Sequence, residues 1–225
     1  IGFGPITAPL SAALQDKRDL GLHTDILTDG VAELIKTGAI TNAAKALHPG
    51  KSIASRGLGS AWLYDFLHND PTVEFHPWHK VCDPWIVSRN ERMTAINAAQ
   101  GVDLTGAAFL ASQEALGFIR GAAEAQGGRV ILVLPSTRAD GQVSNIAPSL
   151  PARIGCSLDG GEVHYVVTEY GVAELLGRSV GERVLEMIGV AHPDFRAALW
   201  REAQEAGYIP HDRQPPSGRY PGELE

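Results

Sequence analysis

The segment Arg-Val-Ile-Leu-Val-Leu at residues 129–134 constrains the fold of this chain more than any other stretch. After its first residue it is continuously apolar and rich in β-branched side chains, as expected for a strand buried on both faces. A helix is expected over residues 112–125, and two glycines, Gly127 and Gly128, separate it from the strand. Strands that alternate with helices are typical of α/β domains, in which helices cover a parallel sheet.

Other strand-like and helix-like stretches alternate along the chain in the same way. Further strands are expected at residues 20–27, 52–56, 93–98, 102–104 and 163–168, with a break near Gly101. Further helices are expected at 29–36, ending before Gly38; around 62–67, capped by Ser60; at 180–188, opened by a Ser179–Glu182 capping box; and from Pro193 to near 207. The predicted fold class is therefore α/β, with a layered, mostly parallel sheet flanked by helices. We expect one domain over residues 1–207 and a tail over 208–225, rich in Pro, Gly and charge, packed on a neighbour.

The composition of the 225 residues is that of a globular protein, with 44% hydrophobic and 20% charged residues. No apolar run approaches the roughly 20 residues that span a bilayer, so no membrane association is expected. The net charge of −7 argues against nucleic acid as a partner. Cys82 and Cys156 are far apart, which favours a reducing compartment, and we expect a cytoplasmic protein. The first residue is Ile rather than Met, as in a sequence that begins inside a longer product.

Two short segments near the N-terminus carry candidate binding and catalytic groups. The opening Gly2, Phe3, Gly4, Pro5 and Ile6 is interpreted either as a tight turn or as a backbone cradle for a coenzyme phosphate or pantetheine arm. The strand at 20–27 carries Asp25, either a surface acid or a nucleophile or base in a partly dehydrated cleft. His23 on the same strand either packs in the core or orients and protonates groups nearby.

Two strand ends in the second half of the chain carry further polar groups. Ser136, Thr137 and Arg138 follow the strand at 129–134, where ligands gather in α/β sheets. They are interpreted either as phosphate or pantetheine contacts or as an ordinary capped turn. Glu169 ends the strand at 163–168, and we expect it to be a buried acid that accepts hydrogen bonds from neighbouring backbone N–H groups.

A third segment, from His76 to Asp83, gathers types of side chain that bind zinc. Its candidate ligands are His76, His79, Cys82 and Asp83. Their spacing matches no closed structural site, and prolines at 77 and 84 indicate an irregular loop. We therefore expect no metal.

These segments, taken in order, resemble the C-terminal half of the acetyl-CoA hydrolase/transferase family. The resemblance runs from residue 1 to about 207 and rests on the stretches at 22–31, 37–42, 59–66, 83–84, 95–97, 102–106, 121–122, 127–128, 134–137, 164–173 and 191–196. It implies a CoA-transferase-like fold and coenzyme A as a substrate. It also implies an exchange of coenzyme A between carboxylic acids, in which a glutamate attacks the acyl-CoA and forms first an anhydride and then a glutamyl-CoA thioester. Finally, it implies that the glycine turn at 2–6 helps to bind the coenzyme.

The chain departs from the family pattern in ways that bear on this chemistry. Asp25 matches the family's glutamate and is one methylene shorter, a glycine-rich loop is missing between Gly106 and Phe118, and Ala139 stands where a lysine is usual. The family's N-terminal half, which borders the active site, is also absent. A misplacement of about 1 Å can cost on the order of a hundredfold in rate.

Three functions therefore stay open. The first is transfer or hydrolysis of the CoA thioester of a small carboxylic acid, through Asp25. The second is a catalytically impaired CoA-binding subunit that pairs with a separate protein supplying the N-terminal half, or with further copies of itself. The third is another acyl-transfer or condensation step, with an acceptor pocket reshaped by Trp78, Trp85 and Phe109.

Overall fold

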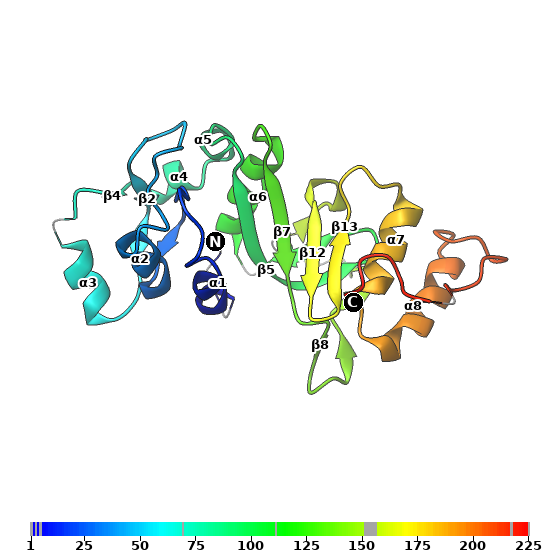
Figure 1. The fold of residues 1–225 in the computed structure, drawn as a ribbon. Coiled ribbons are helices and arrows are strands. Elements are labelled where there is room, and N and C mark those ends of the chain that lie inside the picture. Colours follow the sequence, from blue (N-terminus) through cyan, green and yellow to red (C-terminus); the bar gives the residue numbers. More distant parts are fainter. Residues whose placement is uncertain are drawn as a thin grey trace. The chain divides into compact units, whose positions relative to one another are not determined.

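The computed structural model describes residues 2, 4, 6–68, 70–110, 112–150, 157–216 and 218–224. The chain forms two compact units, drawn in Figure 1. Unit 1 comprises Ile1–Ala95 and Gly117–Arg129, and unit 2 comprises Ile96–Leu116 and Val130–Glu225. The predicted domain boundary near residue 207 stays a prediction.

Unit 1 contains short helices and two small parallel sheets. Its helices are α1 (Thr7–Ala13), α2 (Asp29–Lys36), α3 (Ala61–Leu67), α4 (Trp78–Val81), α5 (Pro84–Ser88) and the part of α6 (Gln113–Glu124) from Gly117 onward. Its strands are β1 (Ile26–Leu27), β2 (Ser52–Ala54), β3 (Arg56–Gly57) and β4 (Val73–Phe75). β1 pairs in parallel with β3, and β2 pairs in parallel with β4.

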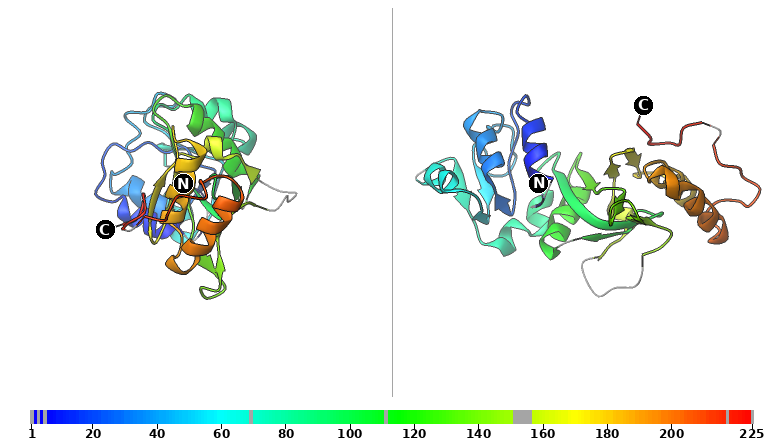
Figure 2. Two further views of the ribbon diagram at one scale, coloured as in Figure 1. Left: turned by 90° about the vertical axis from the view of Figure 1, so that its right-hand side faces the viewer. Right: turned by 90° about the horizontal axis from the view of Figure 1, so that it is seen from below.

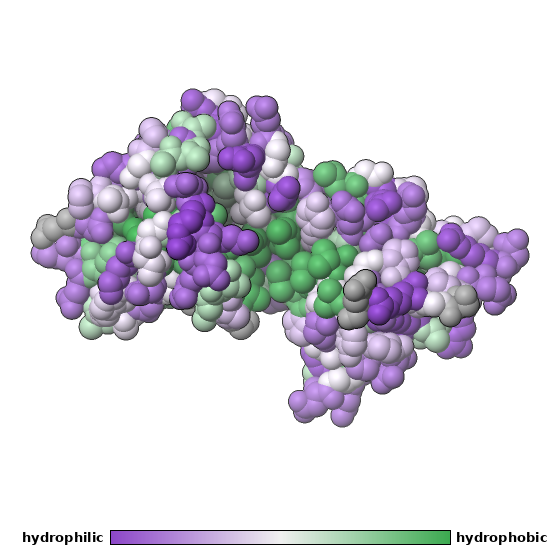
Figure 3. All heavy atoms as spheres, viewed as in Figure 1, coloured by the Kyte–Doolittle hydropathy of each residue, from purple (hydrophilic) through white to green (hydrophobic). Residues whose placement is uncertain are grey.

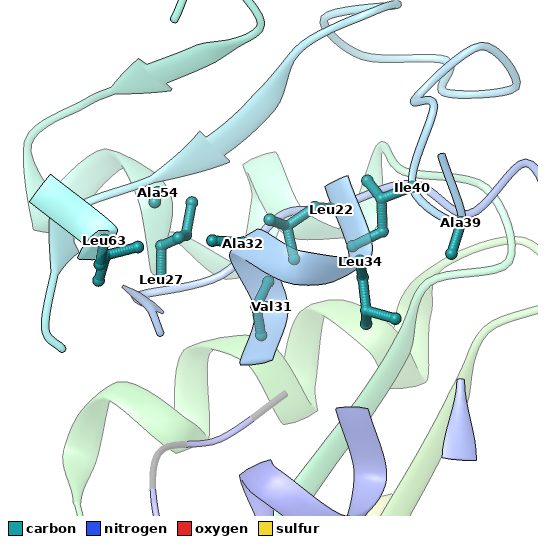
Figure 4. Close-up of a cluster of buried hydrophobic side chains, with 9 residues drawn as sticks. All are labelled: Leu22, Leu27, Val31, Ala32, Leu34, Ala39, Ile40, Ala54 and Leu63. Atoms are coloured by element: carbon teal, nitrogen blue, oxygen red, sulfur yellow. The ribbon is translucent and has the colours of Figure 1, made fainter. Parts of the chain in front are cut away.

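The apolar face of α2 organises a core in unit 1. Asp29 in the first turn of α2 and Lys36 in the last complement the helix dipole, and Gly38 follows with a φ of 78°. Nine buried side chains cluster around this face, as Figure 4 shows: Leu22, Leu27, Val31, Ala32, Leu34, Ala39, Ile40, Ala54 and Leu63. Each Leu, Val or Ile side chain that is fully buried contributes roughly 1.5–3 kcal/mol relative to exposure.

Glycines on α6 allow α4 and α5 to approach its backbone closely. A Cβ at Gly117 would lie 1.9 Å from the carbonyl oxygen of Cys82, and one at Gly121 would lie 2.7 Å from that of Pro84. The carboxylate of Asp83 caps α5 by accepting hydrogen bonds from the backbone N–H groups of Trp85 and Ile86. The segment 82–88 is therefore fixed against a helix face that has no side chains.

Unit 2 is built on a seven-stranded mixed sheet. Its path is β11 (Ser157–Leu158), β6 (Ala108–Leu110), β5 (Thr94–Asp103), β7 (Arg129–Val133), β12 (Tyr165–Thr168) and β13 (Gly171–Glu174), with β10 (Ile146–Ala147) pairing with β5. The pairs β7–β12 and β10–β5 are parallel, whereas β6 and β13 pair with their neighbours in an antiparallel sense. A helical turn at Gly160–Glu162 precedes β12. The predicted α/β class is confirmed.

Two helices follow the sheet. α7 (Val180–Gly189) packs against β13, and α8 (Pro193–Glu205) packs against α7. Figure 2 shows this part of the chain, in yellow to orange, from two further directions. The predicted capping box is present, because the Ser179 hydroxyl accepts from the Glu182 N–H and the Glu182 carboxylate accepts from the Ser179 N–H. A hairpin of β8 (Thr137–Arg138) and β9 (Val143–Ser144) projects from the sheet (Figure 1).

The end of the predicted tail contacts unit 2 of the same chain. The backbone N–H of Val172 donates to the carbonyl of Gly222, and that of Leu224 donates to the carbonyl of Tyr170. The guanidinium of Arg196 on α8 lies 2.7 Å from the Glu223 carboxylate. This end of the tail therefore packs on β13 and α8 of its own chain, and the expectation that the tail packs on a neighbour stays a prediction.

Three local expectations need correction. Of the strand expected at 20–27, only Ile26–Leu27 pairs continuously, although Leu20 and His23 form isolated bridges. Ser60 stands at the start of α3 without capping it, because its hydroxyl donates to Asp29 at 2.6 Å. β5 is continuous through Gly101, where the register of its pairing with β6 shifts. A glycine in a strand interior commonly marks such a bulge.

Hydrophilic residues cover much of the face drawn in Figure 3, apart from smaller apolar areas. Among the described residues, no helix is both long enough and apolar enough to cross a membrane.

Candidate active site

Asp25 is held by the parallel pairing of β1 with β3. Its carbonyl oxygen accepts the backbone N–H groups of Ser55 and Arg56, at 3.0 and 3.1 Å. The Ser55 hydroxyl forms a short hydrogen bond to one carboxylate oxygen of Asp25, and the Arg56 guanidinium lies 2.6 Å from the other. Sequence analysis did not identify these two partners, although both lie at the end of the strand expected at 52–56.

The ion pair between Asp25 and Arg56 is weak enough for the Asp25 carboxylate to react. The Asp25 side chain is 15% exposed, whereas that of Arg56 is 56% exposed. An ion pair with so exposed a partner is worth about 1 kcal/mol or less, because water solvates the guanidinium when it moves away. The Ser55 hydroxyl remains to orient the carboxylate.

His23 is a packed core histidine. Its Nε2 lies 2.8 Å from the carbonyl oxygen of Val81, which makes this nitrogen the donor, and its ring meets that of Phe118 edge-on. The other nitrogen, Nδ1, is buried without a hydrogen-bond partner. Burial, together with the positive charge of Lys45, lowers the pKa of His23 to about 4 against the raising effect of the Val81 hydrogen bond. This geometry favours the packing interpretation, and a catalytic role for His23 stays a prediction.

The opening glycine turn leads directly into α1, a helix that the sequence did not predict. The carbonyl oxygens of Gly2 and Gly4 accept the hydroxyl and the backbone N–H of Thr7, at 3.0 and 3.1 Å. Gly4 has a φ of 152°, which favours glycine, and open space surrounds its missing Cβ. Ile6 directly precedes the helix. Phe3 and Pro5 lie outside the described residues, and the coenzyme role of the turn stays a prediction.

The segment Ser136–Arg138 in unit 2 divides into a buried and an exposed part. Ser136 is fully buried and donates both its hydroxyl and its backbone N–H to Glu169, at 2.5 and 2.9 Å. Thr137 is half-buried, and the exposed Arg138 donates to the Asn145 side chain at 2.7 Å. The side chain of this segment that is best placed to meet a phosphate is therefore that of Arg138.

Glu169 fulfils one of its two expectations. It accepts a backbone N–H, as predicted, but it is exposed rather than buried. Although partial desolvation opposes the effect, the two hydrogen bonds from Ser136 lower the pKa of Glu169. Its carboxylate thus secures the turn that leads into the β8–β9 hairpin.

The ligand set suggested by the sequence around His76 does not assemble. Asp83 caps α5, and His79 is exposed on α4. His76 instead lies beside Glu74 and His48. His48 lies 28 residues before His76 in the chain, so motif spacing could not identify this group.

Comparison with known proteins agrees with this architecture. The sequence profile of the acetyl-CoA hydrolase/transferase C-terminal domain matches residues 59–203. The 4-hydroxybutyrate coenzyme A transferase of Clostridium kluyveri is 39% identical over 214 residues, which cover 90% of this chain and 49% of that protein. Succinyl-CoA:cyclohexane-1-carboxylate CoA transferase of Geobacter metallireducens is 36% identical over 218 residues, or 93% and 50%.

The fold is also that of solved relatives. The crystal structure of RipA from Yersinia pestis superposes with a TM-score of 0.86 at 38% identity, covering 92% of this chain and 48% of that one. The chain spans about half the length of the relatives it matches. It belongs to the acetyl-CoA hydrolase/transferase family and corresponds to that family's C-terminal domain.

Proposed function

We propose that this chain acts on the CoA thioester of a small carboxylic acid, by transfer or hydrolysis, with Asp25 as nucleophile or base. Family membership supports chemistry on acyl-CoA, and relatives at 36–39% identity carry the names of CoA transferases. The observation that carries the proposal is the partly exposed carboxylate of Asp25, which the Ser55 hydroxyl orients. The sequence resemblance implies that this position corresponds to the family's glutamate.

In the transfer route, an Asp25 oxygen attacks the thioester carbonyl, and the carbon–sulfur bond breaks to release the CoA thiolate. The product is a mixed anhydride between Asp25 and the acyl group. The thiolate then attacks the Asp25 carbonyl, which forms an enzyme thioester and releases the carboxylic acid as its anion. A second carboxylate then attacks the enzyme thioester, which releases the CoA thiolate and forms a new anhydride with Asp25. The thiolate attacks the acyl carbonyl of that anhydride, which forms the new acyl-CoA and frees the Asp25 carboxylate.

In the hydrolysis route, Asp25 acts as a base toward water. Its side chain is one methylene shorter than glutamate, which leaves room for a water molecule between the carboxylate and the thioester. Asp25 would remove a proton from that water as the water oxygen attacks the thioester carbonyl. The products are the carboxylic acid and coenzyme A.

We assign coenzyme binding to the turn at residues 2–6 and to Ser136, Thr137 and Arg138. The exposed guanidinium of Arg138 supports this assignment, because it suits a phosphate group. The buried Ser136 would act indirectly, through the turn that it and Glu169 hold in place.

The test is mass spectrometry of the 225-residue chain after incubation with a panel of acyl-CoA thioesters. In the transfer route we expect a covalent CoA adduct at residue 25 in the wild type and in Asp25→Glu, and none in Asp25→Ala. In the hydrolysis route we expect the wild type to release free coenzyme A from the thioester without forming an adduct. Turnover of Asp25→Ala should fall by at least about a hundredfold, the lower end of what a positioned acid or base contributes. Asp16→Ala, which removes an exposed acid elsewhere in unit 1, is the matched control. Unchanged turnover in Asp25→Ala would refute the proposal.

The second candidate is a catalytically impaired CoA-binding subunit that pairs with a protein supplying the N-terminal half. Its support is the engagement of both Asp25 oxygens by Ser55 and Arg56, together with the match to only half of each relative. In that case the chain alone binds acyl-CoA, forms no adduct and gains activity only with its partner. Calorimetry with acyl-CoA, combined with the adduct measurement and the turnover of the chain alone, distinguishes the two candidates.

A further inference from the structure

We propose that His48, Glu74 and His76 form a binding site for a divalent transition-metal ion of the Zn²⁺ type in unit 1. The three ligand atoms lie within 4.8 Å of one another. Two imidazoles and one carboxylate are a ligand set that zinc accepts, with a fourth position left for water or another ligand. This inference departs from the absence of metal expected from the sequence, and it does not depend on the proposed function.

The distances suit a single ion. The Nε2 of His76 lies 3.0 Å from Oε2 of Glu74, and the Nδ1 of His48 lies 3.9 Å from the same oxygen. Two ligand atoms about 2.1 Å from a tetrahedral ion lie roughly 3.4 Å apart. Both observed distances are close to that value, so small side-chain rotations would bring the three atoms into coordination.

The two oxygens of Glu74 face different partners. Oε2 faces both imidazoles, whereas Oε1 lies 3.7 Å from the ammonium of Lys51. The same ammonium donates a hydrogen bond to the carbonyl oxygen of Pro71 at 2.5 Å. The Lys51 ammonium therefore lies beside Oε1, and Oε2 remains available to bind an ion as a monodentate ligand.

Backbone structure brings the three residues together. Glu74 and His76 are two residues apart along an extended segment, so their side chains leave the same face. β4 pairs with β2, and the N–H of His76 extends this ladder by donating to the carbonyl of Ala54.

A tight turn holds the third ligand. The N–H of Lys51 donates to the carbonyl of His48 across Pro49 and Gly50, and Gly50 has a φ of 75°. Proline followed by a glycine at positive φ is the signature of a type II turn. His48 itself has a φ of 53°, an uncommon conformation in which histidine is enriched. The turn thus fixes the direction in which the His48 imidazole leaves the backbone.

The three side chains are also accessible to an ion from solvent. Between 31% and 37% of each is exposed, so a metal can enter and the fourth position can hold water. The rings of His48 and His76 lie edge to face at 5.2 Å. A cation between them and Glu74 would offset the negative charge of the carboxylate.

The experiment is a titration of the 225-residue chain with Zn²⁺ by calorimetry, and with Co²⁺ by visible absorption. We expect one ion per chain in the wild type and a Co²⁺ spectrum characteristic of mixed nitrogen and oxygen ligands. Glu74→Gln and His48→Asn should each weaken binding by at least about a hundredfold, the upper end of the cost of losing an outer-shell partner. Asparagine tolerates the positive φ at position 48, so His48→Asn removes the imidazole without straining the turn.

The matched control is the double variant His79→Ala/His211→Ala, which removes two exposed histidines and should bind Zn²⁺ as the wild type does. Circular dichroism of each variant establishes that it is folded. The proposal is overturned if the folded wild type binds no Zn²⁺ at micromolar concentration. It is equally overturned if His48→Asn and Glu74→Gln both bind as tightly as the wild type.

Discussion

At the scale of single residues, the buried imidazole of His23 links the stability of unit 1 to pH. Burial lowers its pKa from 6.5 to about 4, while the Val81 carbonyl acts in the opposite direction. Charge–charge interactions with Lys45, His48 and His76 each lower this pKa further. The unfolded chain therefore binds a proton at His23 at a higher pH than the folded chain does.

We predict that His23 makes the protein less stable as the pH falls from about 6.5 to about 4. In this window the unfolded state binds a proton at His23 and the folded state does not. The free energy of unfolding therefore falls by about 3 kcal/mol by the time the pH reaches the lower limit. His23→Gln retains a donor for Val81 and should lose this contribution. Urea unfolding of both proteins at several pH values measures the difference, and parallel curves would contradict the prediction.

At the scale of elements, the glycine face of α6 decides how closely α4 and α5 can pack. Gly117 and Gly121 present no side chain to the backbone of the segment 82–88. Helix propensity alone favours alanine over glycine by about 1 kcal/mol in a helix interior. Close packing is the physical reason for glycine at these two positions.

We predict that Gly117→Ala destabilises the protein despite that gain in propensity. The new Cβ would lie 1.9 Å from the Cys82 carbonyl oxygen, so backbone must move, and overpacking of this kind costs about 1–3 kcal/mol. Gly161→Ala, where open space surrounds the added methyl group, should stay within about 0.5 kcal/mol of wild type. Thermal unfolding tests both variants. Equal melting temperatures for Gly117→Ala and the wild type would show that α4 and α5 can move away from α6 at little cost.

Helices were easier to predict from this sequence than long-range pairs. α2 and α7 begin and end at residues whose capping chemistry is local, such as Asp29, Gly38 and Ser179. The sequence does not predict α1, because the Gly-Pro opening resembles an extended turn. The irregular loop expected around Pro77 and Pro84 is wrong, because each proline stands at the start of a short helix, α4 or α5. The Asp25–Arg56 pair depends on the register of β1 with β3, which no local signal specifies.

The same limit applies to the candidate sites. Asp25 was identifiable as a chemical group, but its partners Ser55 and Arg56 come from another strand. The group of His48, Glu74 and His76 needs a turn and a separate strand to meet. The sequence grouped His76 with His79, Cys82 and Asp83, because adjacency in the chain was the only indication of which side chains lie together.

At the scale of the whole molecule, residues 220–224 complete the edge of unit 2. The Arg196 guanidinium lies over the rings of Tyr170 and Tyr220, at 5.8 and 5.5 Å, and pairs with Glu223. Gly189 permits the close approach, since a Cβ there would lie 2.1 Å from the Pro221 carbonyl oxygen. A largely buried cation thus depends on a carboxylate from the far end of the chain.

We predict that Glu223→Gln lowers the free energy of unfolding by about 1.5–3 kcal/mol, the usual contribution of a hydrogen bond to a charged group. The amide keeps the shape of the side chain but leaves the Arg196 charge without its counter-ion. Glu205→Gln, at an exposed position on α8, serves as the control and should have little effect. Guanidinium chloride unfolding measures both variants, and equal stability would mean that water solvates Arg196 well enough.

The chain passes between the two units three times, after residues 95, 116 and 129. Phe118 and Ile119, both buried, therefore reach unit 1 only after the first strands of unit 2 have been synthesised. Unit 1 is complete only when the ribosome has synthesised residue 129. The two units therefore cannot fold one after the other during synthesis, as consecutive domains can. Expression of residues 1–95 alone would yield an incomplete fragment, and separating the units genetically requires a circular permutation or a rewired connection.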